Sequence, residues 1–386
     1  MGHDAKRRKS HWTVVQIIPN LGTGGAERST LEVARALAFA GHRSVVISGG
    51  GRWVKRLTRS GSEHIKLPVG VKSLLIIVTL LRLRQQLKAL APDLIHVRSR
   101  LPAWLVKFAL WGLSPRPALV STVHGLNSVS AYSRILTRAD RVIAVSNTTR
   151  DYLLRHYPKL DPECIRVIPR GADPAEFSPA TVLTGDWRGQ FYSNFPMLAK
   201  GVLLTLPGRG TRLKGHADAI KLLARVRAAG IDARLLLLGV VEDNRLHYLH
   251  ELQSLADEMG VADFLALSAA RSDIREIYAI SDLILQLSTH PESFGRVVAE
   301  ALCMGKPVLG YDHGGVGELL KDFYPAGRAP LGNLDALTER AKALLRNAPP
   351  VDNARVPKVA DLQRLTLSVY AELLEQAPPD PAFDAP

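Results

Sequence analysis

The sequence predicts an α/β protein of two doubly wound domains in series, whose parallel sheets face each other across a cleft. Three observations carry this prediction. The chain has 386 residues, which is too long for one ordinary hydrophobic core. Short apolar runs alternate with longer helical patterns, as expected for parallel strands covered on both faces. The alternation restarts after a Pro-, Gly- and Trp-rich interval, residues 169–196. Ligands of such open sheets bind outside the carboxyl ends of the strands.

Residues 1–180 are expected to form the first domain, because alternating strands and helices indicate a parallel sheet with helical crossovers. The predicted strands are Val14–Pro19, Ser44–Ser48, Asp93–Val97, Leu119–His124, Arg141–Val145 and Ile165–Ile168. The predicted helices are Ala26–Ala40, Ser73–Leu90, Pro102–Trp111 and Asn147–Tyr157.

Residues 181–350 repeat the alternation and are expected to form the second domain. The predicted strands are Val202–Leu206, Ala233–Leu238, Phe264–Leu267, Leu283–Leu287 and Pro307–Gly310. The predicted helices are His216–Ala229, Arg245–Met259, Ser272–Ile280, Phe294–Met304 and Leu334–Arg346. Residues 351–386 are expected to add one C-terminal helix, Pro357–Gln376, and a loose tail.

The composition is that of a globular protein, with 46% hydrophobic and 22% charged residues. Cys164 and Cys303 match neither a disulfide nor a metal-site spacing, which favours a reducing compartment. The polar and basic residues 1–11 do not resemble a secretory signal. The longest apolar run, Leu74–Leu81, is much shorter than the roughly 20 residues of a membrane span. We therefore expect a cytoplasmic protein that is not integral to a membrane.

Positive charge is concentrated in the first part of the chain. Residues 1–180 hold 28 Lys and Arg against 11 Asp and Glu, a balance of +17. The remaining residues hold 22 against 25, a balance of −3. This asymmetry predicts a polyanionic partner, and its simpler alternative is a solvated basic surface. Nucleic acid is disfavoured because the cations are not interleaved with aromatic side chains.

An anionic membrane surface is the partner that we expect for these cations. Basic residues cluster in Lys6–Lys9, Arg52–Arg59 and Arg82–Lys88. The last cluster adjoins the apolar run Leu74–Leu83, as in helices that lie in a membrane interface. A helix buried in the first domain would give the same pattern, so this alternative stays open.

A glycine-rich turn, Asn20–Arg28, follows the first strand and opens the first helix. Gly24 and Gly25 would let backbone amides approach a ligand, and a helix N-terminus favours negative charge. The match to a dinucleotide-binding fingerprint is poor, because Glu27 stands where that pattern has Gly or Ala. The second strand also lacks the acidic residue of that fold, which disfavours an NAD-dependent oxidoreductase. A plain tight turn is the alternative for this segment.

A second turn, Leu206–His216, joins a strand to a helix of the second domain. It contains Gly208, and the cations Arg209 and Lys214 flank it. Two cations and free amides at a helix N-terminus are well suited to a diphosphate. Ordinary surface cations on a loop are the alternative.

The segment from Pro291 contains two carboxylates, Glu292 just before a predicted helix and Glu300 about two turns inside it. The residues between them are mostly apolar, so Glu300 should be largely buried. A buried carboxylate is costly unless it is paired. The two hydroxyls of a ribose would pair with Glu300, and a structural salt bridge is the alternative.

His124 ends a central strand of the first domain and is followed by a glycine. A histidine at the carboxyl end of such a strand faces the ligand side of the sheet. A core histidine with satisfied hydrogen bonds is the alternative.

Taken together, these segments resemble glycosyltransferase family 4, the retaining enzymes with two Rossmann-like domains known as GT-B. This family includes bacterial lipopolysaccharide-core and phosphatidylinositol mannosyl enzymes. The strongest mark is Glu292 and Glu300 followed by Ala301–Val308 and the Gly314-Gly315 pair. Val142–Ser146 and Val167–Asp173 also resemble the family's end of the first domain.

The resemblance implies roles for individual residues. Gly24 and Gly25 would border the donor phosphates and the acceptor, and His124 would sit beside the transferred sugar. Gly208, Arg209 and Lys214 would hold the leaving diphosphate. Glu292 would touch the donor sugar, and Glu300 would bind the ribose.

The donor site would also include Ser293, Phe294 and Gly295. Ser293 is a departure, because the family's usual Glu-Gly-Phe-Gly reads Glu-Ser-Phe-Gly here. An amide that needed glycine geometry would now belong to Ser293, which affects the recognition of the donor sugar.

The activity that follows is metal-independent transfer of a hexose from a UDP- or GDP-linked donor to a lipid-linked or glycan acceptor. Lipopolysaccharide or cell-envelope polysaccharide synthesis is the expected setting, at the inner face of the plasma membrane. No cofactor and no nucleic-acid partner are expected. The alternatives are a sugar-nucleotide epimerase or phosphorylase of the same fold, and a catalytically silent carbohydrate- or membrane-binding protein.

Overall fold

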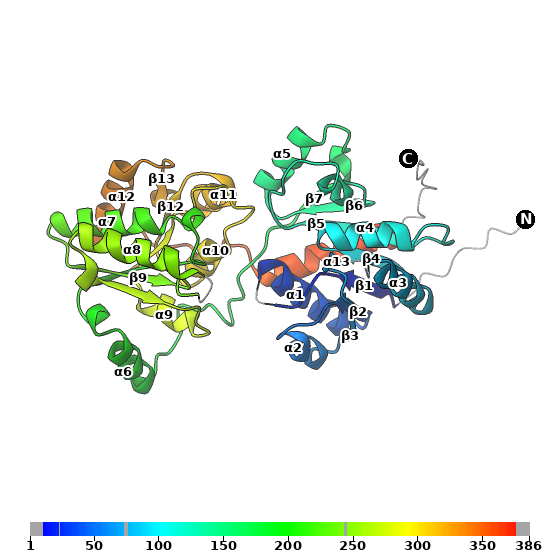
Figure 1. The fold of residues 1–386 in the computed structure, drawn as a ribbon, viewed down its shortest axis with the longest axis horizontal. Helices are drawn as coiled ribbons and strands as arrows, with labels where there is room; N and C mark the ends of the chain where they lie inside the picture. The colour runs from blue at the N-terminus through cyan, green and yellow to red at the C-terminus, as the bar shows by residue number, and fades with distance from the viewer. Residues whose placement is uncertain (1–10, 23, 73–75, 243–244, 376–386) are drawn as a thin grey trace, which may run out of the picture. The chain divides into compact units, whose positions relative to one another are not determined.

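The computed structural model of the chain is described for residues 11–22, 24–72, 76–242 and 245–375 (Figure 1). The chain divides into two compact units. Unit 1 contains residues 1–170 together with 359–386, and unit 2 contains residues 171–358. The expected boundaries lay at residues 180 and 350 instead. The C-terminal helix is therefore part of unit 1, and the tail predicted over the last residues lies outside the described ranges.

Unit 1 is built on a seven-stranded sheet in the order β3-β2-β1-β4-β5-β6-β7, and its described strand pairs are all parallel. Central strands such as VVQI and LIHV are fully buried, because helices cover both faces. The strands are β1 Thr13–Ile17, β2 Arg43–Ser48, β3 Glu63–Lys66, β4 Leu94–Val97, β5 Ala118–Val123, β6 Arg141–Ala144 and β7 Ile165–Val167.

The helices of unit 1 form one layer on each face of this sheet. On one face, α1 and the C-terminal α13 lie side by side over Val14, Leu94 and Val120 (Figure 1). On the other face, α3 and α4 pack together over Val15 and Ile95. The helices are α1 Gly25–Phe39, α2 Val54–Arg59, α3 Ile76–Leu90, α4 Arg100–Ala109, α5 Asn147–His156 and α13 Val359–Glu375.

Unit 2 is built on a six-stranded sheet in the order β10-β9-β8-β11-β12-β13, again with parallel pairing between its described strands. Its strands are β8 Val202–Pro207, β9 Ala233–Leu238, β10 Leu265–Ser268, β11 Leu283–Gln286, β12 Val308–Tyr311 and β13 Arg328–Ala329. Its helices are α6 Gly185–Asn194, α7 His216–Ala228, α8 Leu246–Glu258, α9 Ile274–Ile280, α10 Arg296–Cys303, α11 Gly314–Phe323 and α12 Leu334–Asn347. The predicted fold class of two doubly wound α/β units is confirmed.

Several elements were missed because their sequence signals are weak. The edge strand β3 reads EHIK, without the apolar run of a buried strand. The strand β13 has only two residues. The helix α11 begins with Gly314 and Gly315, which are poor helix formers. The two glycines were noted as a motif, but their place at the start of a helix was not predicted.

Both sheets reverse their winding direction between two adjacent central strands. In unit 1 these strands are β1 and β4, and in unit 2 they are β8 and β11. The chain leaves the two strands toward opposite sides, so a crevice opens beyond their carboxyl ends, where ligands of open α/β sheets bind. The segments after these strands are therefore the first places to look for a functional site. Among the helices that the structure describes, none is long and apolar enough to cross a membrane.

Candidate functional site

In unit 2, the turn after β8 packs directly against the segment that follows β11. Gly215 has φ +73°, and a Cβ there would fall 2.0 Å from the carbonyl oxygen of Leu287. The Thr289 amide donates to the Leu213 carbonyl at 2.9 Å. Only glycine allows so close an approach in this backbone conformation. The approach brings the cations of the first turn beside the carboxylates that follow β11.

Glu292 is the centre of the polar cluster at this place. Its Oε1 accepts from Lys214 Nζ at 2.5 Å, from Ser288 Oγ at 2.6 Å and from Gln286 Nε2 at 2.9 Å. All three donors converge on one oxygen, which leaves Oε2 for a further donor such as a sugar hydroxyl. The side chains of Lys214 and Glu292 are 26% and 23% exposed, so a ligand can reach both. The structure thus brings together two of the residues that the sequence singled out.

The Gly314-Gly315 pair fixes the loop that carries Glu292. The Gly315 amide donates to the Glu292 carbonyl at 2.7 Å. A Cβ on Gly315 would lie 2.5 Å from the Phe294 Cα, so any side chain would push the loop away. His313 Nε2 also lies 2.6 Å from the Ser288 carbonyl. The start of α11 therefore positions the carboxylate through backbone contacts.

The other predicted donor-site residues lie around this cluster. Gly208 borders the Lys214 side chain, since a Cβ there would lie 3.2 Å from Lys214 Cγ. Arg209 is exposed, and within the described ranges its guanidinium makes no hydrogen bond or ion pair. Its predicted role rests on its place in the turn.

The segment that leads into α10 holds the remaining predicted residues. Gly295 has φ +95° and caps the helix, Phe294 is buried, and Ser293 is half-buried. Because α10 begins at Arg296 rather than at Phe294, Glu300 lies about one turn inside the helix instead of two. Glu300 is 7% exposed, as expected for a carboxylate on the buried face.

His216, the first residue of α7, is an uncharged support for the turn. It is fully buried, and its Nδ1 lies 3.1 Å from the Tyr248 hydroxyl. Burial, aided by the nearby Lys214 charge, lowers the pKa of His216 to about 4. The imidazole therefore stays neutral at physiological pH and adds no charge beside Lys214.

In unit 1, Gly24 and Gly25 stand at the N-terminus of α1, as predicted. A Cβ on Gly24 would lie 2.3 Å from the Glu27 carboxylate, which folds back over the turn. A negative group thus already lies beside the positive end of the helix dipole. An anion that bound here would have to displace the Glu27 side chain.

His124, just beyond β5, lies between two arginines of unit 1. Arg170 Nη2 is 2.7 Å from His124 Nδ1 and 3.1 Å from the His124 carbonyl oxygen. Arg98 Nη1 is 3.5 Å from His124 Nε2. Arg98 also donates twice to Gln16 Oε1, through Nε at 2.8 Å and Nη2 at 2.6 Å. Gln16 belongs to β1 and Arg98 follows β4, so this cluster lies at the switch point of the sheet.

The C-terminal helix is joined to the same strands through buried polar contacts. His96 of β4 lies between Tyr370 of α13 and Thr122 of β5, with both oxygens 2.6 Å from its ring nitrogens. Burial, with a smaller effect of Arg98, holds the pKa of His96 well below its ordinary value. Burial also lowers the pKa of Arg98 to about 10, so this guanidinium stays charged at neutral pH. The helix α13 is thus held to the strands that precede Arg98 and His124.

Sequence reasoning missed four residues of these clusters: Gln16, Arg98, Gln286 and Ser288. The two glutamines carried a usable signal, because each is a polar residue within an otherwise apolar central strand. Arg98 and Ser288 follow central strands closely, where ligand contacts are expected. Arg170 belongs to the segment Val167–Asp173, which resembles the family, but no role was predicted for it.

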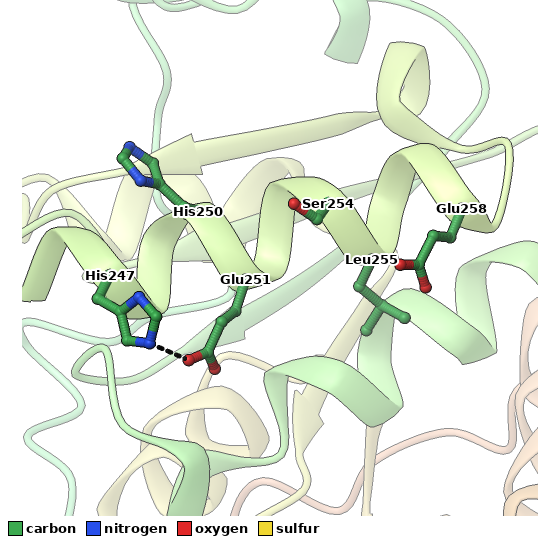
Figure 2. A pocket seen from close by; sticks show the side chains of 6 residues that line it. All are labelled: His247, His250, Glu251, Ser254, Leu255 and Glu258. Atoms are coloured by element: carbon green, nitrogen blue, oxygen red, sulfur yellow. Dashed lines mark ion pairs between the residues drawn. The ribbon is translucent and has the colours of Figure 1, made fainter.

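A shallow depression lies on the surface of the single helix α8 (Figure 2). It is lined by His247, His250, Glu251, Ser254, Leu255 and Glu258. All six belong to one helix, and His247 Nε2 contacts Glu251 one turn later at 3.1 Å. No strand end contributes to it, so it is not a ligand crevice of the sheet.

Two family models match the chain. The model described as Glycosyltransferase Family 4 matches residues 23–176, and the model described as Glycosyl transferases group 1 matches residues 199–356. The first match falls almost wholly in unit 1, and the second falls in unit 2 and contains its polar cluster.

A curated relative is the D-inositol 3-phosphate glycosyltransferase of Corynebacterium kroppenstedtii, 30% identical over 187 residues. That alignment covers 47% of this chain and 40% of the relative, and the chain spans about half the length of the curated relatives it matches. A solved glycosyltransferase from Rickettsia africae has a TM-score of 0.80 and 26% identity, covering 96% of this chain and all of that one. Anabaena Alr3699/HepE, solved with UDP-glucose, has a TM-score of 0.76 at 19% identity, covering 94% and 100%.

Proposed function

Because this chain belongs to glycosyltransferase family 4, we propose that it transfers a hexose from a nucleotide-sugar donor to a lipid-linked or glycan acceptor. The reaction would proceed without a metal ion and with retention of configuration at the anomeric carbon. Lipopolysaccharide or cell-envelope polysaccharide synthesis is the proposed setting.

The observation that carries this proposal is the ion pair of Lys214 and Glu292 beyond the switch point of unit 2. It offers a cation for a diphosphate and a carboxylate oxygen for a sugar hydroxyl at adjacent places. A nucleotide sugar carries both groups, and it joins them at the bond that breaks.

The chemistry asked of these residues is the stabilisation of a departing diphosphate. As the bond between the anomeric carbon and the phosphate oxygen breaks, negative charge grows on the diphosphate. Lys214 and Arg209 would hold this charge more strongly in the transition state than in the ground state. The acceptor hydroxyl would attack the anomeric carbon from the face that the diphosphate leaves and give its proton to a diphosphate oxygen.

The donor is proposed to be linked to UDP or GDP. HepE, which has the same fold, was solved with UDP and with UDP-glucose, and this supports a nucleotide-sugar donor. For the acceptor, a further chemical class enters, since the curated relatives are named for inositol 3-phosphate. A phosphorylated inositol, a lipid-linked sugar and a lipopolysaccharide core should therefore be offered side by side.

We also propose that unit 1 docks on the anionic inner face of the plasma membrane, where a lipid-linked acceptor is presented. One stripe of α3 supports this. Ile77 and Leu81 are 66% and 61% exposed, and Arg84 follows on the same face of the helix, whereas Leu83 and Leu87 are buried. The helix is thus amphipathic rather than wholly buried.

The end of α4 continues this apolar stripe. Arg84 Nη1 donates to the carbonyls of Ala109 and Trp111, at 2.7 and 2.6 Å, and so joins α3 to the end of α4. Trp111 is 78% exposed and Phe108 is 43% exposed. We call the exposed side chains of Ile77, Val78, Leu81, Phe108 and Trp111 the apolar ridge. The cations Arg82, Lys88 and Lys107 belong to the same two helices, a combination that suits an anionic lipid surface.

The decisive experiment measures nucleotide release with and without acceptors. A thermal-shift screen of UDP, GDP, ADP and their sugars identifies the nucleotide first, since a ligand at 100 times its Kd adds about 2.7 kcal/mol of stability. Release of the nucleoside diphosphate that requires an acceptor supports the transferase. Conversion of the donor without an acceptor would identify an epimerase. Transfer to inorganic phosphate would identify a phosphorylase. Binding of the nucleotide sugar without turnover would identify a catalytically silent binding protein.

A further inference from the structure

Gln286, the last residue of β11, is a buried glutamine that uses only one end of its amide group. It is 1% exposed, and the rest of the strand reads Leu-Ile-Leu. Its Nε2 donates to Glu292 Oε1 at 2.9 Å. The Oε1 atom of Gln286 is buried too, and within the described ranges no group donates a hydrogen bond to it. A buried acceptor without a hydrogen bond is costly, so the strand keeps this glutamine for a use that an apolar residue could not supply.

The partner determines which end of this amide faces it. A carboxylate only accepts hydrogen bonds, so the group that lies 2.9 Å from Glu292 Oε1 is the NH2 of Gln286 and not its oxygen. For the same reason the Ser288 hydroxyl donates to that oxygen, at 2.6 Å. Ser288 is 3% exposed, and its carbonyl oxygen accepts from His313 Nε2 at 2.6 Å. Two neutral donors on buried residues therefore converge on one atom of Glu292.

Lys214 is a different kind of partner for this carboxylate. Its side chain is 26% exposed, and its ammonium group stands at the end of a flexible stem. The Glu292 side chain is 23% exposed, so such an ion pair alone would leave the carboxylate free to turn. The buried donors of Gln286 and Ser288 have no such freedom. They fix the place of Oε1 and thereby that of Oε2.

We propose that Gln286 is a positioning residue for the donor sugar: with Ser288 it holds Glu292 Oε1, so that Oε2 keeps one place for a sugar hydroxyl. The sugar contact rests on the proposed function, whereas the contact of Gln286 with Glu292 does not depend on any activity. Lys214 is then not needed to orient the carboxylate and can turn its remaining donors toward the diphosphate.

Unfolding of the whole chain tests the contact without substrate. Gln286→Met keeps the length of the side chain and removes its donor, and Glu292→Met removes the acceptor. Because the two residues are in contact, the double variant should lose less stability than the sum of the two single losses. Gln286→Met combined with Glu258→Gln is the matched control, and its effects should add, since Glu258 is exposed on α8. Additive effects of Gln286→Met and Glu292→Met would overturn the proposal.

Calorimetric titration with two ligands separates positioning from folding. The ligands are UDP and UDP-glucose, or GDP and GDP-glucose if the thermal-shift screen selects guanine. Gln286→Met should lower the affinity for the nucleotide sugar roughly 10-fold, the size of one hydrogen bond to a charged group, and leave that for the nucleoside diphosphate unchanged. Gln286→Glu keeps the shape and should lower the sugar affinity further, because two carboxylates would then meet. The exposed Gln253→Met is the matched control and should change neither affinity.

Two results of this titration would also overturn the proposal. Equal losses for both ligands in Gln286→Met, or no loss for either, would make Gln286 a structural residue. Wild-type affinity for the nucleotide sugar in Gln286→Glu would show that the donor end of the amide is not needed. If Gln286→Glu does not fold, Gln286→Met and the unfolding measurements still decide. A chain that binds neither ligand would refute the proposed function and with it the sugar contact, and unfolding would still show whether Gln286 holds Glu292.

Discussion

Lys214 and Glu292 are counter-ions in unit 2, with Nζ 2.5 Å from Oε1, and yet each is assigned to a different part of the donor. Under the proposed function, the lysine would hold the diphosphate and the carboxylate would hold the sugar. An ammonium group has three donors, so Lys214 can keep Glu292 and still donate to a phosphate oxygen. Under this proposal, the pair would act as one unit that contacts the donor on both sides of the bond that breaks.

The first prediction is that Lys214→Ala and Arg209→Ala each lower turnover by roughly 100- to 1000-fold, the typical loss for one transition-state donor. Because Lys214 and Glu292 share a contact, the loss in a Lys214→Ala, Glu292→Gln double variant should be smaller than the product of the single losses. Steady-state kinetics measure both effects. Lys321→Ala and Arg346→Ala, exposed cations elsewhere in unit 2, are the controls. Wild-type turnover in both cation variants would contradict the assignment.

The second prediction concerns the ribose. Glu300→Gln should weaken nucleotide binding and leave the fold intact, because the amide keeps the shape and loses the charge that accepts hydroxyl groups. Calorimetric titration with the nucleoside diphosphate measures the affinity, and thermal unfolding checks the fold. Glu258→Gln, an exposed carboxylate of the α8 depression, should bind the nucleotide normally (Figure 2). An unchanged affinity in Glu300→Gln would make Glu300 a structural residue.

The third prediction is that sugar transfer survives EDTA, because side chains are assigned the task of neutralising the diphosphate. Activity should be equal before and after chelation, followed through nucleotide release with acceptor present. Loss of activity that magnesium or manganese restores would show that a metal ion shares this task.

The fourth prediction is salt-sensitive binding to anionic vesicles. Each Lys or Arg near an anionic leaflet contributes about 1 kcal/mol, and this attraction fades over a Debye length of about 8–10 Å. Co-sedimentation should detect binding to vesicles with anionic lipid at low salt and much less at high salt. Equal binding to neutral and anionic vesicles, or none to either, would remove electrostatic docking.

The apolar ridge makes its own contribution to this binding. Leu81→Ser and Trp111→Ser should weaken vesicle binding at every salt concentration, because the buried apolar area is lost. Phe39→Ser is the matched control, since Phe39 is 95% exposed but belongs to α1. An equal effect of all three substitutions would assign the loss to general surface hydrophobicity.

The fifth prediction is that stability falls in mild acid. The pKa of His216 is about 4 in the folded chain against an ordinary value of 6.5, so the unfolded chain binds a proton that the folded chain rejects. Stability should therefore decrease as pH drops from 6.5 toward 4, by up to about 3 kcal/mol for this group. The buried His96 acts in the same direction. Thermal unfolding should show a shallower pH slope in His216→Asn and an unchanged slope in the exposed His156→Asn.

Most of the long elements of both units could be predicted from the sequence, although the ten-residue helices α6 and α11 were missed. The apolar runs of the parallel strands and the amphipathic helices between them were found to within a few residues, since burial on both faces requires them. The short elements β3, β13 and α2 could not be predicted. An element of so few residues is too short to show a hydrophobic periodicity.

The sequence by itself determined which segments follow the central strands, and thereby that Lys214, Glu292 and His124 are candidates for chemistry. Tertiary structure alone decided their neighbours. Lys214 and Glu292 are 78 residues apart along the chain, and His96 and Tyr370 are 274 apart. Strand order and backbone packing set such distances, as in the contact of Gly215 with Leu287. A linear pattern records which side chains are present, but the hydrogen bonds that orient them depend on which strands the sheet places side by side.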